Sequence, residues 1–311
     1  MVARRITLLG PQRLSPTLDQ AVEALGVRGR VAAVTAGWEE REAEDLELDE
    51  HLGGRVVNLE VYKRADDVFQ HDPELFAAMR ERHDRMRQLQ ELYRLRLAAE
   101  LETARALLCM DGDPELLEPE RESAIAAVRA LDEHHLERVR AVFAEFDERW
   151  RPREREHVVR HRREIAAILE ETECLCIAGG HVAILLNRTR LFDVLGLAGD
   201  QPVIGWSAGA MVLAERIVLF HDSPPQGAGN AEVLGAGLGL CPGVVPLPHA
   251  SRRLRLDDAT RVGLFARRFG PDLCGALDER TRLSWDGKRW TGDPGTRRLS
   301  PEGTLVEVGG A

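Results

Sequence analysis

Residues 202–211, which read PVIGWSAGAM, decide the fold. Val203–Trp206 is an apolar run that predicts a buried strand, and the small residues after Ser207 begin a helical pattern. The pattern G-x-S-x-G across such a junction is typical of a tight strand-to-helix turn that strains the serine and exposes its hydroxyl. N–H groups at the start of the helix would face a developing oxyanion. Ser207 is therefore a candidate nucleophile, although small residues there would also suit simple helix–strand packing.

Similar apolar runs recur on both sides of this motif, and helix-like stretches separate them. This alternation predicts an α/β fold with a mostly parallel sheet and helices on both faces. The five runs that predict the sheet are Ile6–Gly10, Val31–Thr35, Val56–Val61, Cys174–Gly180 and Val203–Trp206. Four later runs could extend or edge it: Arg216–Phe220, Gly243–Pro248, Arg282–Trp285 and Thr304–Val308.

The middle of the chain is poor in glycine, with only Gly112 in residues 60–171. Apolar residues recur in steps of three and four from Pro73 to Cys109, which predicts an amphipathic helix roughly 54 Å long. A turn, a second helix to Trp150 and a third helix after Pro152 follow. We expect residues 60–173 to be a helical insertion in an α/β domain formed by residues 1–59 and 174–311. Its apolar stripe would pack on that domain or on a second copy in a homodimer, and a lid over the substrate is the alternative.

Composition restricts the partners and the compartment. The chain has 42 basic and 52 acidic residues, and its formal net charge of −10 argues against a nucleic acid or an anionic membrane surface as partner. Five scattered cysteines do not form a disulfide framework, so we expect a cytoplasmic protein. Cys174 and Cys176 share one face of a strand, which favours core packing.

No motif calls for a cofactor. A P-loop or a G-x-G-x-x-G sequence is missing from the strand–helix junctions, so no cofactor is expected. His157 and His161 are four residues apart without the carboxylate of an H-E-x-x-H motif, and no metal is expected either. Six histidines of the insertion have the pattern of solvated helix residues: 71, 83, 134, 135, 157 and 161.

A nucleophilic serine needs a base and a carboxylate that orients the base. His249 follows the strand-like run Gly243–Pro248, and Asp222 follows Arg216–Phe220. Both would then lie at carboxyl ends of strands, where open α/β sheets hold their sites. Only 15 residues separate Ser207 from Asp222, which leaves little room for the strand–helix units of a lipase-like esterase.

These residues resemble the serine peptidase family of dipeptidase E (aspartyl dipeptidase) and cyanophycinase. The resemblance lies in GWSAGAM at 205–211, HDSP at 221–224 and PH at 248–249, with IAGGHV at 177–182 and GALDERT at 275–281. It implies a class I glutamine-amidotransferase-like fold with serine in place of the amidotransferase cysteine. It also implies Ser207 as nucleophile, His249 as base, Asp222 as its orienting residue, and N–H groups of Gly180 and Ala208 in the oxyanion hole.

Further positions are candidates for substrate binding. The resemblance implies that Gly179 and the residue at 181 line the site, but His181 stands where the family usually has Asn or Asp. His181 is therefore a candidate substrate contact or a rival base. Arg252, Arg253 and Arg255 could clamp a substrate carboxylate, or could be ordinary surface arginines.

We therefore expect a serine hydrolase of the dipeptidase E type that cleaves a peptide or related amide bond through an acyl-enzyme. The partner would be a small peptide or amide. Two alternatives remain: an amidase or esterase that acts on a small metabolite with the same triad, and a non-catalytic assembly protein that uses the helical insertion.

Overall fold

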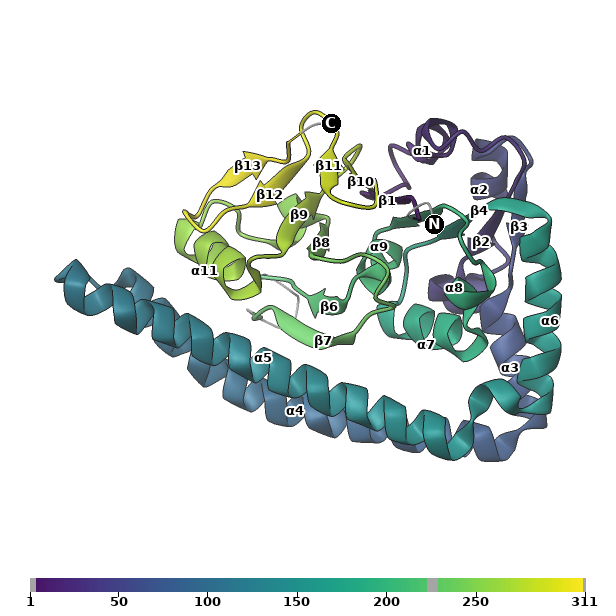
Figure 1. The fold of residues 1–311 in the computed structure, drawn as a ribbon, viewed down its shortest axis with the longest axis horizontal. Coiled ribbons are helices and arrows are strands. Elements are labelled where there is room, and N and C mark those ends of the chain that lie inside the picture. The colour runs from purple at the N-terminus through teal and green to yellow at the C-terminus, as the bar shows by residue number, and fades with distance from the viewer. Residues whose placement is uncertain (1–3, 223–228, 310–311) are drawn as a thin grey trace.

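The computed structural model describes residues 4–309 apart from 223–228 and has a seven-stranded central sheet of order β11-β10-β1-β5-β4-β2-β3 (Figure 1). Strands β1, β5, β4, β2 and β3 are parallel, whereas β10 and β11 are antiparallel at one edge. The predicted mixed α/β class with a mostly parallel sheet is therefore confirmed. The parallel strands are β1 (Ile6–Leu9), β2 (Arg30–Val34), β3 (Val56–Asn58), β4 (Thr172–Ile177) and β5 (Val203–Trp206).

Helices cover both faces of this sheet, so alternate residues of one strand enter different cores. In β4, Cys174 and Cys176 lie in the core beneath α1 and α2, whereas Leu175 and Ile177 belong to the core beneath α6, α7 and α9. Both cysteines are free, buried thiols, which confirms their predicted packing role. The helices are α1 (Leu18–Ala24), α2 (Leu46–His51), α6 (Glu156–Glu170), α7 (Val182–Phe192), α8 (Val194–Leu197) and α9 (Ala208–Leu213), with a 3₁₀ turn η1 (Ala36–Arg41) after β2.

Of the four later apolar runs, only Arg282–Trp285 joins the central sheet, as β10. The expectation was wrong for the others, because an apolar run predicts a strand without identifying its neighbour. A second sheet has the order β13-β12-β9-β8, and β6 pairs with β7 in a separate hairpin. The elements of this half are β6 (Arg216–Leu219), β7 (Glu232–Ala236), β8 (Val244–Pro248), α10 (Ala250–Arg253), α11 (Ala259–Phe269), β9 (Leu273–Leu277), β10 (Arg282–Trp285), β11 (Trp290–Gly292), β12 (Arg297–Leu299) and β13 (Leu305–Glu307).

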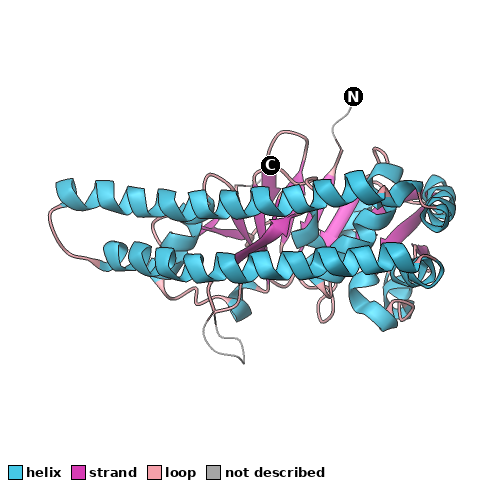
Figure 2. Ribbon diagram, turned by 90° about the horizontal axis from the view of Figure 1, so that it is seen from below, coloured by secondary structure: helices cyan, strands magenta, loops and turns pink. Residues whose placement is uncertain are grey.

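The long helices α4 (Pro73–Cys109) and α5 (Pro114–Trp150) form an antiparallel pair, here called the arm, along the length of the molecule (Figure 2). Both start at an Asp-Pro pair, in which the aspartate accepts a backbone N–H and proline fits the first turn. The predicted helix from Pro73 to Cys109 is confirmed. In residues 4–222 and 229–309, neither these helices nor any other is apolar enough to span a membrane.

The arm connects to the body through α3 (Val61–His71) on one side and through η2 (Pro152–Glu154) and α6 on the other. Two insertion histidines expected to be solvated are buried: His135 is 3% exposed and His161 is 7% exposed. His135 stacks on Tyr93, and His161 Nε2 lies 2.7 Å from an oxygen of Asp67. The expectation failed because residues distant in sequence cover both rings. Asp67 pairs with His161, whereas His135 is covered by the ring of Tyr93 and its Nε2 has no hydrogen-bond partner among the described residues.

A buried ion pair fastens the arm to the second half of the chain. Arg268 of α11 donates from Nε and Nη2 to the two oxygens of Asp132 on α5, each at 2.7 Å. The hydroxyl of Tyr93 on α4 donates to Asp132 at 2.7 Å and accepts from Arg268 at 2.8 Å and from the Val233 N–H of β7 at 3.1 Å. Both charged side chains are 3% exposed. Four elements therefore meet at one satisfied polar cluster.

Substituting Asp132→Ala would leave the guanidinium of Arg268 buried without its counter-charge, and we expect the free energy of unfolding to fall by about 3–5 kcal/mol. Urea unfolding measures this change. The matched control is Glu133→Ala, which removes the exposed partner of Arg140 from the next position of the same helix and should cost less than about 1 kcal/mol. Equal losses in the two variants would show that the buried pair does not fasten the arm.

Candidate active site

Ser207 lies at the junction between β5 and α9, in a backbone conformation that non-glycine residues rarely adopt. Its φ is 51° and its ψ is −120°, and the residue is partly exposed. Such a conformation costs about 1–3 kcal/mol and persists only where the surroundings impose it. Gly209 supplies one such constraint, because a Cβ there would lie 2.0 Å from the carbonyl oxygen of Ile177. The predicted strained turn is therefore confirmed.

The carboxyl ends of three parallel strands meet around this serine. Val34 of β2 is level with Ile177 of β4, and Ile177 is level with Gly205 of β5. The segments that follow the three strands consequently lie side by side at one edge of the sheet, which is where open α/β sheets bind ligands.

The glycine loop after β4 contacts Ser207 directly. A Cβ at Gly179 would lie 2.9 Å from Ser207 Cβ and 3.6 Å from its Oγ. The loop is held by a 2.7 Å hydrogen bond from the His181 N–H to the carbonyl of Gly37. In the described part of the chain the N–H groups of Gly180 and Ala208 have no acceptor, so both remain available as donors.

His181 has a structural position that explains its departure from the family pattern. It is the N-cap of α7, where its Nδ1 accepts the N–H of Ile184 at 3.3 Å. Asn and Asp are also good N-cap residues. The exposed imidazole of His181 therefore replaces the acceptor that an amide or carboxylate would supply, and its Nε2 stays available to a ligand.

His249 reaches the same region from the second sheet. It follows β8, and Asp278 follows the parallel neighbour β9, in which Leu277 is level with Pro248. Asp278 abuts the end of β1, since a Cβ at Gly10 would lie 1.7 Å from the Asp278 carbonyl oxygen. Because β1 is the neighbour of β5 in the central sheet, the structure brings the edge that carries His249 next to the edge that carries Ser207.

Burial lowers the pKa of His249, and the positive charges of Arg253 and Arg252 lower it further. Asp278 and Glu279 oppose this effect. The imidazole is therefore neutral over a wider range of acidic pH than an ordinary histidine, and a neutral ring is the form that accepts a proton.

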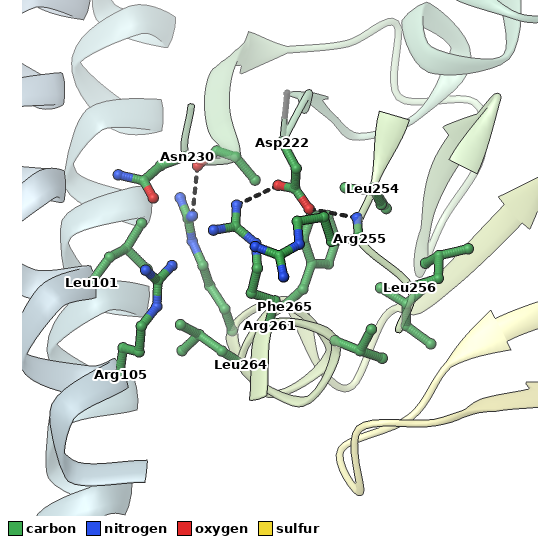
Figure 3. Close-up of a pocket in the computed structure, with 14 residues that line it drawn as sticks. Leu101, Arg105, Asp222, Asn230, Leu254, Arg255, Leu256, Arg261, Leu264 and Phe265 are labelled. Carbon is green, nitrogen blue, oxygen red and sulfur yellow. Dashed lines mark hydrogen bonds and ion pairs between the residues drawn. The ribbon is translucent and has the colours of Figure 1, made fainter. Parts of the chain in front are cut away.

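Asp222, the predicted orienting residue of His249, has hydrogen-bond partners of its own in this structure. Its two oxygens accept hydrogen bonds from the guanidinium of Arg261 and, at 2.7 Å, from the backbone N–H of Arg255 (Figure 3). Among the described residues, His249 does not donate to this carboxylate in this conformation. Asp222 instead lines a small cavity of about 50 Å³ between the arm and α11.

The three candidate substrate-binding arginines differ in their surroundings. Arg252 is exposed and forms a 2.8 Å ion pair with Glu279. Arg255 is exposed and lines the cavity beside Asp222. Arg253 is partly buried, has no carboxylate within 4.0 Å among the described residues, and acts on the charge of His249. Of the three, Arg253 therefore combines a position beside His249 with the absence of a described carboxylate partner.

Among the described residues, one group of side chains has the donors of a metal site. Ligand atoms of Asp67, His71 and His157 lie within 4.8 Å of one another, between α3 and α6. The carboxylate of Asp67, however, already accepts from His161 and Arg160. This cluster therefore acts as a polar contact between the two helices that connect the arm to the body.

Sequence reasoning missed two charged residues of the site, Arg261 and Asp278. The segment containing Asp278 had been identified by resemblance, but its contact with Gly10 and its position beside His249 depend on pairing between β8 and β9. Arg261 had no local signal, because one arginine in an arginine-rich helix is not distinctive.

The fold and the strained serine place this chain among α/β proteins that hold a serine at a sharp strand-to-helix turn. A model of Peptidase family S51 matches residues 125–290, which is more than half of the chain and includes Ser207, Asp222 and His249. The chain belongs to this family.

The chain is similar to a crystal structure of a peptidase from an acI-B1 Actinobacterium, with 15% identity and a TM-score of 0.49 over 99% of this chain and 96% of the other. It is also similar to a putative peptidase E protein from Listeria monocytogenes EGD-e, with 19% identity and a TM-score of 0.30 over 44% of this chain and 65% of the other. A search of curated proteins found no match.

Substituting Arg253→Gln removes a positive charge that disfavours the imidazolium of His249, so the pKa of this histidine should rise. NMR titration of ¹⁵N-labelled histidine side chains measures the shift. Arg163→Gln, an exposed change on α6, is the control and should leave this titration unaltered. An unchanged or lower His249 pKa in the Arg253 variant would contradict the assignment of that charge.

Proposed function

We propose that this protein is a serine peptidase of the dipeptidase E type, with Ser207 as its nucleophile. The strained conformation of Ser207, next to the glycine loop with its available N–H donors, is the observation that carries the proposal. Membership of Peptidase family S51 supports peptide hydrolysis as the reaction.

In this mechanism Ser207 Oγ attacks the scissile carbonyl while His249 takes the hydroxyl proton. The N–H groups of Gly180 and Ala208 donate to the oxyanion of the tetrahedral intermediate. His249 then protonates the leaving amine, which leaves an acyl-enzyme on Ser207. Water, deprotonated by His249, attacks the ester and releases the acid product. Because α9 has only six residues, the local N–H donors carry more of this stabilisation than a helix dipole would.

The proposed substrate is a short peptide with an acidic residue at the scissile bond. Arg253 would pair with its carboxylate, since this guanidinium lies beside His249 without a carboxylate partner in the described chain. The low pKa of His249 is consistent with its role as the general base. A panel of dipeptides and isopeptides, rich in N-terminal Asp and β-Asp, separates this function from an amidase or esterase that would use the same triad.

The substitution Ser207→Ala should reduce kcat for amine release from the cleaved members of this panel by roughly 10⁴–10⁶-fold, because no nucleophile remains. The fold should persist, since alanine meets the same backbone constraint as serine. Amine release and circular dichroism measure the two properties. Wild-type turnover in a correctly folded variant would exclude Ser207 as the nucleophile.

The role of Asp222 needs a separate experiment, because this carboxylate also binds Arg261. If Asp222 orients His249 during catalysis, Asp222→Asn should lower kcat by about 10³–10⁴-fold. The matched variant Arg261→Gln breaks the same ion pair but keeps the carboxylate, so its kcat should stay within about tenfold of wild type.

Equal losses in the two variants would reduce Asp222 to a structural partner of Arg261. Asp278→Asn then becomes decisive, because Asp278 is a carboxylate beside His249. A large loss of kcat in Asp278→Asn, together with a lower His249 pKa, would move the orienting role to that residue.

A further inference from the structure

Two adjoining clefts lie between the arm and the body, on the side of α7 and β7. Figure 1 shows the arm running past these two elements. Their volumes are about 430 Å³ and 610 Å³, and we call them together the arm groove. Neither Ser207 nor His249 lines the arm groove, so it is a separate site. The residues that line both clefts are Met79, Arg82, Phe143, Asn187 and Ala236.

Arginine dominates the charge of the arm groove although the whole chain has a net charge of −10. Four arginines and two aspartates line the smaller cleft. Five arginines and two acidic residues line the larger one, and Arg82 is common to both. A concave surface with an excess of positive charge concentrates anions, and low-dielectric walls strengthen this effect.

Arg82 of α4 and Arg190 of α7 flank one aromatic ring. The guanidinium carbon of each lies 4.6 Å from the ring centroid of Phe143 on α5. Their known acceptors are neutral: Arg82 donates to the side-chain oxygen of Asn187 at 3.1 Å, and Arg190 donates to the carbonyls of Ala236 and Gly237 at 3.0 and 2.7 Å. Stacking and neutral acceptors fix the orientation of both guanidinium groups without neutralising them.

The other two arginines of the smaller cleft are already paired, Arg140 with Glu133 and Arg153 with Asp193. Arg82 and Arg190 have no carboxylate within 4.0 Å in residues 4–222 and 229–309. Burial lowers the pKa of Arg82 to about 10 and also lowers the pKa of Arg190, while the charge of Asp147 only partly compensates. A bound anion would supply the missing counter-charge.

Apolar side chains between these charges indicate the rest of the ligand. Phe69, Phe76, Met79, Met86 and Leu234 line the larger cleft. A phosphate or a free dicarboxylate would leave this apolar surface uncovered, whereas a peptide can carry both acidic and apolar side chains into one groove. We propose that the arm groove binds an acidic peptide segment, with Arg82 and Arg190 holding a carboxylate of that segment.

The test is direct binding to the full chain carrying Ser207→Ala, so that hydrolysis plays no part and a failure of the proposed peptidase activity does not affect the result. The probe is a fluorescein-labelled hexapeptide that alternates aspartate with leucine, and its control replaces each aspartate with asparagine. Fluorescence anisotropy at low salt should show at least tenfold tighter binding of the acidic peptide.

The double variant Arg82→Gln/Arg190→Gln should weaken this binding by at least tenfold. The matched control Arg96→Gln/Arg163→Gln makes the same change of charge at exposed positions outside the groove and should bind like the parent. If circular dichroism shows that the double variant is unfolded, Arg190→Lys replaces it, because lysine keeps the charge but loses the planar fork and should still weaken binding severalfold.

Three results would overturn the proposal: equal affinity for the two peptides, equal affinity of the groove and control variants, or no measurable binding of the acidic peptide. Displacement of the peptide by free glutarate at an equal carboxylate concentration would also overturn it, by assigning the arm groove to a small dicarboxylate.

Discussion

The ion pair between Arg268 and Asp132 holds the arm against α11 and β7, and the arm forms one whole side of the molecule. Removing two charges from water costs several kcal/mol for each ion, so such a pair is tolerated only when every donor and acceptor is used. Here Tyr93, the carbonyl of Ala231 and the N–H of Val233 complete the cluster. The hydrogen bonds of this cluster are all made only when α11, the arm and β7 are in their observed positions. Displacing the arm would leave Arg268 unpaired.

Local sequence predicted the helices and strands better than it predicted which strands pair and which side chains meet. Apolar periodicity was enough to place α4 at Pro73–Cys109, because it acts within one helix. The destination of the strands after Ser207 was not predictable in this way. β8 and β13 leave the central sheet because their neighbours are β9 and β12, and such pairing depends on contacts between residues that are distant in sequence. The prediction that His135 and His161 are solvated was wrong for the same reason, since the residues that cover them, Tyr93 and Asp67, lie far from them along the chain.

The candidate site shows the same division. The conformation of Ser207 follows from G-x-S-x-G between a strand and a helix, and the sequence alone predicted it. The glycine loop and His249 were indicated by residues next to strand ends and by family resemblance. The ion pair of Asp222 with Arg261, and the position of Asp278 beside His249, depend on how α11 and β9 pack. A charged side chain has several partners within reach in a chain with 94 charged residues of four types, so sequence does not select among them.

The width of the arm groove is fixed by contacts at both of its ends, because the arm is attached to the body on either side of it. At its root, Arg155 forms a bidentate contact with Asp72 at 2.5 and 2.6 Å. The cluster of Tyr93, Asp132 and Arg268 lies about 30 Å further along α4, at 1.5 Å for each residue. Met79, Arg82 and Met86 lie between these two fastenings, and neither fastening uses Arg82 or Arg190. The two guanidinium groups are thus held in place by a framework that does not neutralise them, and a preorganised site of this kind loses little entropy when an anion binds.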